Sequence, residues 1–344
     1  MGLVLWIATF VYQLEDIFGY IDDAFSWDLE GHTLLYEPYN KTMPAKQAHL
    51  LQLWDTLGIP HEESKQMWGS MLTIIGFEVD PNAMTISMPL QACTNLINKL
   101  HEFAHPNQWY PLHEFNQLAG WMNWALNAYP LLCSGLSTLY NKMSGKSQSH
   151  QPVHISTALC RELLWFAEHI KHSNGICILS SLKWSADNAD FVAYSDACPS
   201  SMGFWIPSLS LGFQCQTDRP SSAIFYLEAL TLLSGPHWIV TNICPQCSTQ
   251  IVLYTDNSNT VSMFNTLHAQ PSLYPILLTA VDLTLNHNVH FCVFHIPGEQ
   301  NTVADALSCF HNQQAINTAA LTSYTPLHIS LFQPPCLMLG AELL

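Results

Sequence analysis

The sequence contains very few basic residues. Lys and Arg total 10 of 344 residues against 26 Asp and Glu, which gives a formal net charge of −16 at pH 7. No Lys or Arg follows Arg219. This excludes a free-standing basic module for DNA or RNA, because such a module presents a Lys/Arg patch to the phosphates. Hydrophobic residues make up 49% of the chain and aromatic residues 11%, so an intrinsically disordered chain is excluded as well.

The sequence also lacks a hydrophobic run that could cross a membrane. The apolar start, residues 1–12, is shorter than the roughly 20 residues that a membrane-spanning helix needs. It has neither the basic n-region nor the cleavage site of a signal peptide. We expect no membrane association. The apolar start instead predicts a buried core helix, and a helix buried that early suggests the tail of a longer chain.

The cysteines do not form a recognisable framework. There are 11 of them, an odd and scattered set, whereas a secreted disulfide scaffold is shorter and denser in cysteine. We expect reduced thiols and an intracellular protein, in either the cytoplasm or the nucleus. Cys244 and Cys247 form a lone CxxC pair, and without a second ligand pair loop cysteines are favoured over a zinc site.

The hydrophobic pattern divides the chain into two main parts. Helical patterns dominate the first part, the polar segment 143–152 predicts a linker, and a further helix is expected at 155–172. From residue 188 the order is three strands, a helix, a strand, two helices, a strand and a helix, which is typical of a mixed α/β domain. The predicted divisions are 1–142, a linker with its connecting helix at 143–187, the mixed-sheet domain at 188–310, and an irregular tail at 311–344.

Four carboxylates of the second part stand in apolar surroundings. Asp196 and Asp256 each end a predicted strand, while Glu228 and Asp305 lie inside apolar helical segments. Burial there is costly without a cation, and three of the four follow the last basic residue. Bound Mg²⁺ would resolve the conflict, since it prefers oxygen ligands. Taken singly, each acid could instead be a helix cap or turn former, as Asp256 could be for the next helix.

The segments around these acids resemble the ribonuclease H domain of retroelement polyproteins. Asp196 lies in VAYSDAC followed by MGFW, Glu228 in YLEAL, Asp256 in LYTDN, and Asp305 in HIPGEQNTVADALS. In the first part, residues 20–23 (YIDD) resemble the YxDD hairpin of the reverse-transcriptase palm. Residues 118–124 (LAGWMNW) resemble the thumb and connection helix of the same family. The sequence is similar to the C-terminal part of a reverse transcriptase/ribonuclease H polyprotein of the fungal-type, DIRS-like elements. This implies a mixed α/β fold, with a truncated palm, thumb and connection before a ribonuclease H-like domain.

The resemblance implies an enzyme that cuts the RNA strand of RNA–DNA hybrids with two bound Mg²⁺ (or Mn²⁺) ions. Asp196, Glu228 and Asp256 would be metal ligands and Asp305 a more weakly held one. Ser258 and Asn301 are expected to touch the hybrid backbone. Such enzymes read duplex shape and 2′-OH groups rather than base sequence.

The departures from the family pattern limit the expected activity. A palm needs a third aspartate from an upstream strand that this sequence does not contain, so Asp22 and Asp23 are expected to be a vestigial polymerase metal site. His295 precedes Pro-Gly on or beside a strand and does not match the loop His of many cellular relatives. The segment HIPGEQNTVADALS, residues 295–308, resembles the closing motif of the family, and Cys309 stands where a basic residue usually follows it. Two alternatives stay open: an inactive remnant, and a co-opted module that holds a protein partner through exposed aromatics.

Overall fold

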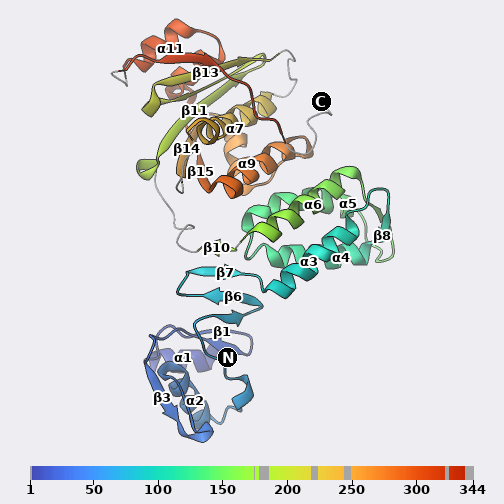
Figure 1. Cartoon of the computed structure of the whole chain (residues 1–344), viewed down its shortest axis with the longest axis vertical. Coiled ribbons are helices and arrows are strands. Elements are labelled where there is room, and N and C mark those ends of the chain that lie inside the picture. The colour runs from blue at the N-terminus through green and yellow to red at the C-terminus, as the bar shows by residue number, and fades with distance from the viewer. Residues whose placement is uncertain are drawn as a thin grey trace. The chain divides into compact units, whose positions relative to one another are not determined.

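The computed structural model describes residues 2–173, 175–177, 186–217, 224–243, 249–321 and 325–337 (Figure 1). The chain separates into two compact units, one of residues 1–92 with 174–181 and the other of residues 93–173 with 182–344. This division falls about 50 residues before the expected boundary at 142, and the CxxC pair at 244 and 247 lies outside the described residues. No helix within the described ranges combines the length and apolar character needed to cross a membrane.

The first unit contains short elements and small cores. Its elements are α1 (Gly2–Phe10), β1 (Phe18–Tyr20), β2 (Asp23–Phe25), β3 (Thr33–Tyr36), β4 (Lys41–Pro44), α2 (Ala45–Leu57), β5 (Leu72–Ile74), β6 (Phe77–Asp80), β7 (Thr85–Ser87) and β10 (Ile176–Cys177). Helix α2 ends where Gly58 adopts a φ of 68°, a conformation that glycine takes without strain. The expected burial of the first helix is wrong, because Ala8 is its one buried residue and Trp6 is 53% exposed.

The second unit begins with a helical part. It comprises α3 (Leu90–Phe103), whose first turn belongs to the first unit, β8 (Trp109–Pro111), α4 (Leu112–Ala125), α5 (Ser137–Met143), β9 (Pro152–His154) and α6 (Thr157–His172). Helix α6 buries Leu159, Leu163, Phe166 and Ile170, and it packs against the 3-10 helix at Pro130–Leu136. The expected connecting helix is therefore a core element of this part, because its apolar stripe covers the preceding helices.

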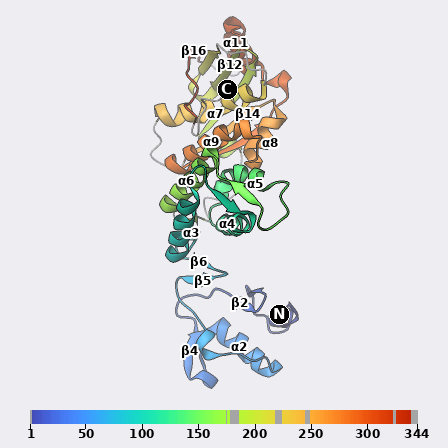
Figure 2. The same ribbon diagram turned by 90° about the vertical axis from the view of Figure 1, so that its right-hand side faces the viewer.

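A six-stranded mixed sheet forms the rest of the second unit, and it confirms the predicted α/β class (Figures 1 and 2). Its order is β15 (Val289–His295), β14 (Thr249–Thr255), β11 (Phe191–Cys198), β12 (Ser201–Ile206), β13 (Leu211–Gln216) and β16 (His328–Leu331). Strands β11, β12 and β13 are antiparallel to their neighbours in this group, whereas β14 runs parallel to β11 and β15 parallel to β14.

Helices cover both faces of this sheet. They are α7 (Ile224–Ile243), α8 (Ser258–Thr266), α9 (Tyr274–His287), α10 (Thr302–Ser308) and α11 (Asn312–Ala319). Adjacent residues on β12 point to opposite faces: Phe204 packs in the core that α7 and α9 contribute to, and Trp205 in the core of α10 and α11. The expectation of an irregular tail is wrong for α11 and β16, because Ala315 and Ala319 of α11 lie in the core that holds Trp205 and Ile329 of β16 packs against it.

Candidate active site

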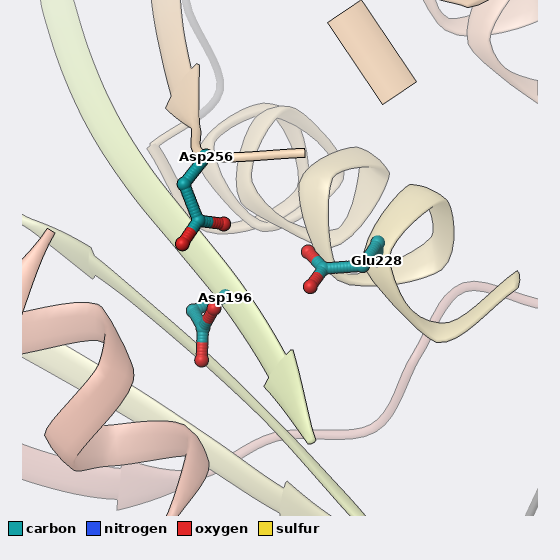
Figure 3. Close-up of side chains that lie close together, drawn as sticks. All are labelled: Asp196, Glu228 and Asp256. Atoms are coloured by element: carbon teal, nitrogen blue, oxygen red, sulfur yellow. The ribbon is translucent and has the colours of Figure 1, made fainter. Parts of the chain in front are cut away.

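Three of the four predicted carboxylates converge at one edge of the sheet (Figure 3). Asp196 lies near the end of β11 and Asp256 directly follows β14. These strands are parallel neighbours with Tyr194 opposite Tyr254, so the residues two positions further on are level with each other. Glu228 reaches the same point from α7, and one oxygen of each carboxylate lies within 4.8 Å of the others. The sheet register thus assembles the cluster from segments far apart in the sequence.

Asp196 and Glu228 are the two deeply buried members of the cluster, and burial raises the pKa of both. Asp196 is 7% exposed. Burial raises its pKa to about 6, against an opposing hydrogen bond from Ser308, and the negative charges of Asp256 and Asp305 add to the rise. Glu228 is 5% exposed. Burial, together with the charges of Asp196 and Asp256, raises its pKa to about 8. At neutral pH Glu228 is therefore mostly protonated when no cation is present.

The donor set fits a hard divalent cation. Glu228 accepts hydrogen bonds from the Ala197 amide and the Thr255 hydroxyl, but its Oε2 is buried without any partner. None of the ion pairs in the described part of the chain brings a Lys or Arg to the three acids. Oxygen ligands without a protein cation are what Mg²⁺ and Mn²⁺ prefer. A bound cation would satisfy the orphaned oxygen and offset the mutual repulsion of the cluster.

The other predicted site residues lie around this cluster in different settings. Asp305 is exposed on the first turn of α10. It lies outside the group of three, yet its charge contributes to the raised pKa of Asp196. Ser258 is exposed at the start of α8. Asn301 is 2% exposed, and its Nδ2 donates to the Ser195 carbonyl at 3.0 Å, which ties β11 to the segment before α10.

Residues without a predicted role support the cluster. The Ser308 hydroxyl donates to Asp196 Oδ2 at 2.5 Å. A Cβ atom on Gly298 would lie 3.0 Å from Asp256 Oδ2, so this glycine allows the backbone to approach the carboxylate closely. His295 ends β15, as expected for a strand residue, and its Nε2 lies 3.1 Å from the Asp256 carbonyl oxygen. All three belong to the closing motif around Asp305. Their place in that motif was the feature of the sequence that could have predicted a position near the cluster.

The position of α10, and with it Ser308, depends on a close approach to Gly203. A Cβ atom at Gly203 would lie 2.4 Å from the Ser308 nitrogen and 2.7 Å from the Leu307 carbonyl carbon. We expect Gly203→Ala to push α10 away from β12 and to lower the free energy of unfolding by about 1–3 kcal/mol. Denaturant unfolding followed by circular dichroism measures the change.

Gly120→Ala is the matched control for this prediction. Gly120 lies in α4 with nothing within 4 Å of an added Cβ, so the substitution is expected to stabilise by about 0.5–1 kcal/mol through helix propensity. A Gly203→Ala protein as stable as the wild type would show that α10 does not pack as closely as described.

The YxDD segment forms the hairpin predicted for it. Strands β1 and β2 pair with Tyr20 opposite Asp23, and Ile21 and Asp22 make the turn. Both aspartates are exposed, and neither belongs to a cluster of metal-ligating groups among the described residues. Many aromatic side chains near the hairpin are also exposed, including Trp6, Tyr20 and Trp27; a protein partner for them stays a prediction.

No protein-family model matches the sequence, and no curated protein sequence does either. Among solved structures, the chain is similar to a foamy viral protease-reverse transcriptase in complex with RNA/DNA hybrid, with a TM-score of 0.38 and 12% identity over 85% of this chain and 37% of that one. It is also similar to the foamy viral protease-reverse transcriptase in complex with dsDNA, with a TM-score of 0.37, 13% identity, and coverage of 85% and 57%. The chain thus spans less than two thirds of the length of these proteins.

Proposed function

We propose that this chain is a retroelement-derived ribonuclease H that uses Mg²⁺, or Mn²⁺, to hydrolyse the RNA strand of RNA–DNA hybrids. The observation that carries the proposal is the convergence of Asp196, Glu228 and Asp256, with Glu228 Oε2 buried and unpartnered. Three carboxylates without a protein cation are poor structural elements, because their desolvation and repulsion are not repaid. They are good ligands for divalent metal ions.

The residues of the chain have separate tasks in this proposal. Divalent ions held by these carboxylates would activate a water molecule and stabilise the leaving oxygen. Asp196 and Asp256 present their oxygens from adjacent strand ends, and Ser308 orients Asp196 through its hydrogen bond. Glu228 must release its proton to act as a ligand. Asp305, exposed beside the cluster, is proposed as a weaker ligand, and Ser258 as a contact to the hybrid backbone.

Polymerase activity is not part of the proposal. Asp22 and Asp23 lie on an exposed hairpin and belong to no cluster of metal-ligating groups among the described residues. We propose that this pair is a vestigial polymerase site. Descent from DIRS-like, fungal-type elements is likewise proposed from the sequence motifs.

The scarcity of basic residues favours a second candidate function, that of a non-cutting remnant or binding module. Arg219 is the one Lys or Arg in the sequence from residue 188 onwards. Proteins that hold nucleic acid usually neutralise several phosphates with Lys and Arg. Weak hybrid binding would therefore limit turnover even with an intact metal site.

One assay separates the two candidates. The full chain is incubated at low ionic strength with an RNA–DNA hybrid labelled on either strand, with Mg²⁺ or with EDTA. Double-stranded RNA and DNA of the same sequence are the controls. The proposal predicts shortening of the RNA strand of the hybrid alone, and only with Mg²⁺. Binding of the hybrid without cutting, at any protein concentration, would support the binding module instead.

A further inference from the structure

A second cluster of reactive side chains lies next to the acidic one. The end of β11, the start of β12 and the residues after α10 enclose a surface pocket of about 600 Å³. Its lining includes two thiols, Cys198 and Cys309, but none of the three clustered carboxylates. Because none of the proposed metal ligands lines this pocket, its two thiols have no task in the proposed hydrolysis.

Both sulfur atoms of the pocket approach the same residue. Cys198 Sγ lies 3.4 Å from the Ser308 carbonyl oxygen, and Cys309 Sγ lies 3.8 Å from the Ser308 hydroxyl oxygen. Cys309 is exposed and Cys198 is partly exposed, and neither is in a disulfide. Two thiols 111 residues apart in sequence thus contact the same residue and line the same surface pocket, within reach of a small reagent in solvent.

The geometry points to a redox-reactive thiol pair in which Cys198 and Cys309 join as a disulfide when a peroxide enters the pocket. One sulfur attacks the peroxide, so that an S–O bond forms, the O–O bond breaks and one water leaves. The other sulfur then attacks the oxidised one, so that the S–S bond forms, the S–O bond breaks and a second water leaves. The two thiols lose two electrons and two protons in total, and the peroxide gains them.

A disulfide between Cys198 and Cys309 would also affect the neighbouring carboxylate Asp196. Cys198 lies two residues after Asp196, and Cys309 directly follows Ser308, whose hydroxyl donates to Asp196. The Ser201 hydroxyl also donates to the Ser308 carbonyl, at 2.5 Å. A covalent link between β11 and the end of α10 therefore acts on the backbone that sets the Ser308–Asp196 hydrogen bond.

Mass spectrometry of the full-length protein tests the pair without any need for nuclease activity. The reduced protein is treated with a few equivalents of hydrogen peroxide, and free thiols are blocked with an alkylating reagent before digestion without reductant. We expect a linked pair of peptides that contain Cys198 and Cys309, with loss of two hydrogens. The link should disappear in Cys198→Ser and in Cys309→Ser, and it should persist in Cys292→Ser, which removes a partly buried thiol on β15.

Unfolded protein provides the second arm of the test. In urea the specific link should fall at least about tenfold relative to other pairings, because proximity in the fold, rather than reactivity alone, selects the partners. The inference is overturned if both cysteines remain alkylatable after peroxide treatment of the folded protein. It is also overturned if Cys309 pairs as readily with the exposed Cys336.

Discussion

Asp256→Asn is expected to reduce Mg²⁺-dependent cutting of an RNA–DNA hybrid by at least about a hundredfold, the lower end of the cost of removing one charge-stabilising group from an active site. The substitution keeps the size of the side chain but removes the negative charge from the least buried of the three clustered acids. The cluster would then offer a divalent cation one charged ligand fewer. Initial rates of RNA shortening with wild-type and variant protein measure the effect.

Asp187→Asn is the matched control for this prediction. Asp187 is an exposed acid on the 3-10 helix at Ala186–Asn188, ahead of β11 in the same unit, so the charge change is the same while the cluster stays intact. We expect its rate to equal that of the wild type. Equal rates for the Asp256→Asn and wild-type proteins would mean that the cutting belongs to another site or to a contaminating nuclease.

Glu228→Gln is expected to stabilise the metal-free protein at pH 8 and to have little effect at pH 5. The folded state raises the pKa of Glu228 to about 8 from its ordinary value of 4.5, so the folded protein holds this proton more tightly than the unfolded chain does. Without metal, the contribution of the Glu228 proton to the free energy of unfolding is therefore fully present below about pH 4.5, and it is lost as pH rises through about 8. The neutral Gln removes this loss, which is on the order of a few kcal/mol.

Thermal unfolding in EDTA across this pH range tests the prediction. The midpoint of Glu228→Gln should exceed that of the wild type by roughly 5–10 °C at pH 8, and the two should converge at pH 5. Added Mg²⁺ should raise the midpoint of the wild type more than that of the variant, because binding to the folded state stabilises it. Parallel pH profiles of the two proteins would contradict the assigned burial of the Glu228 carboxylate.

The sequence predicted the elements of the sheet domain well because their patterns are strong. The strand before Asp196 and the helix around Glu228 are nearly uninterrupted apolar runs, and the structure has them as β11 (Phe191–Cys198) and α7 (Ile224–Ile243). The pairing of β11 with β14 was not accessible, since a parallel register depends on contacts between distant segments. The level positions of Asp196 and Asp256 became clear only from that register.

The errors occurred where packing decides the outcome. An apolar helix at the start of the chain was expected to be buried, yet Ala8 is the one buried residue of α1. The tail was expected to be irregular, but Leu327 and Phe332 pack onto the sheet domain and β16 adds a strand beside β13. A short segment such as β16 has a weak pattern, and it forms a strand because the edge of an existing sheet offers hydrogen bonds.

The proposed function depends on metal binding by the three carboxylates, and titration of the protein with Mn²⁺ at pH 8, followed by the electron paramagnetic resonance signal of the free ion, measures that binding. We expect wild-type protein to remove one to two equivalents of Mn²⁺ from solution. A protein that carries both Asp196→Asn and Glu228→Gln should remove none while still unfolding cooperatively. Equal binding by the two proteins would mean that the ions are held somewhere other than at the edge of the sheet, and the proposed metal site would be wrong.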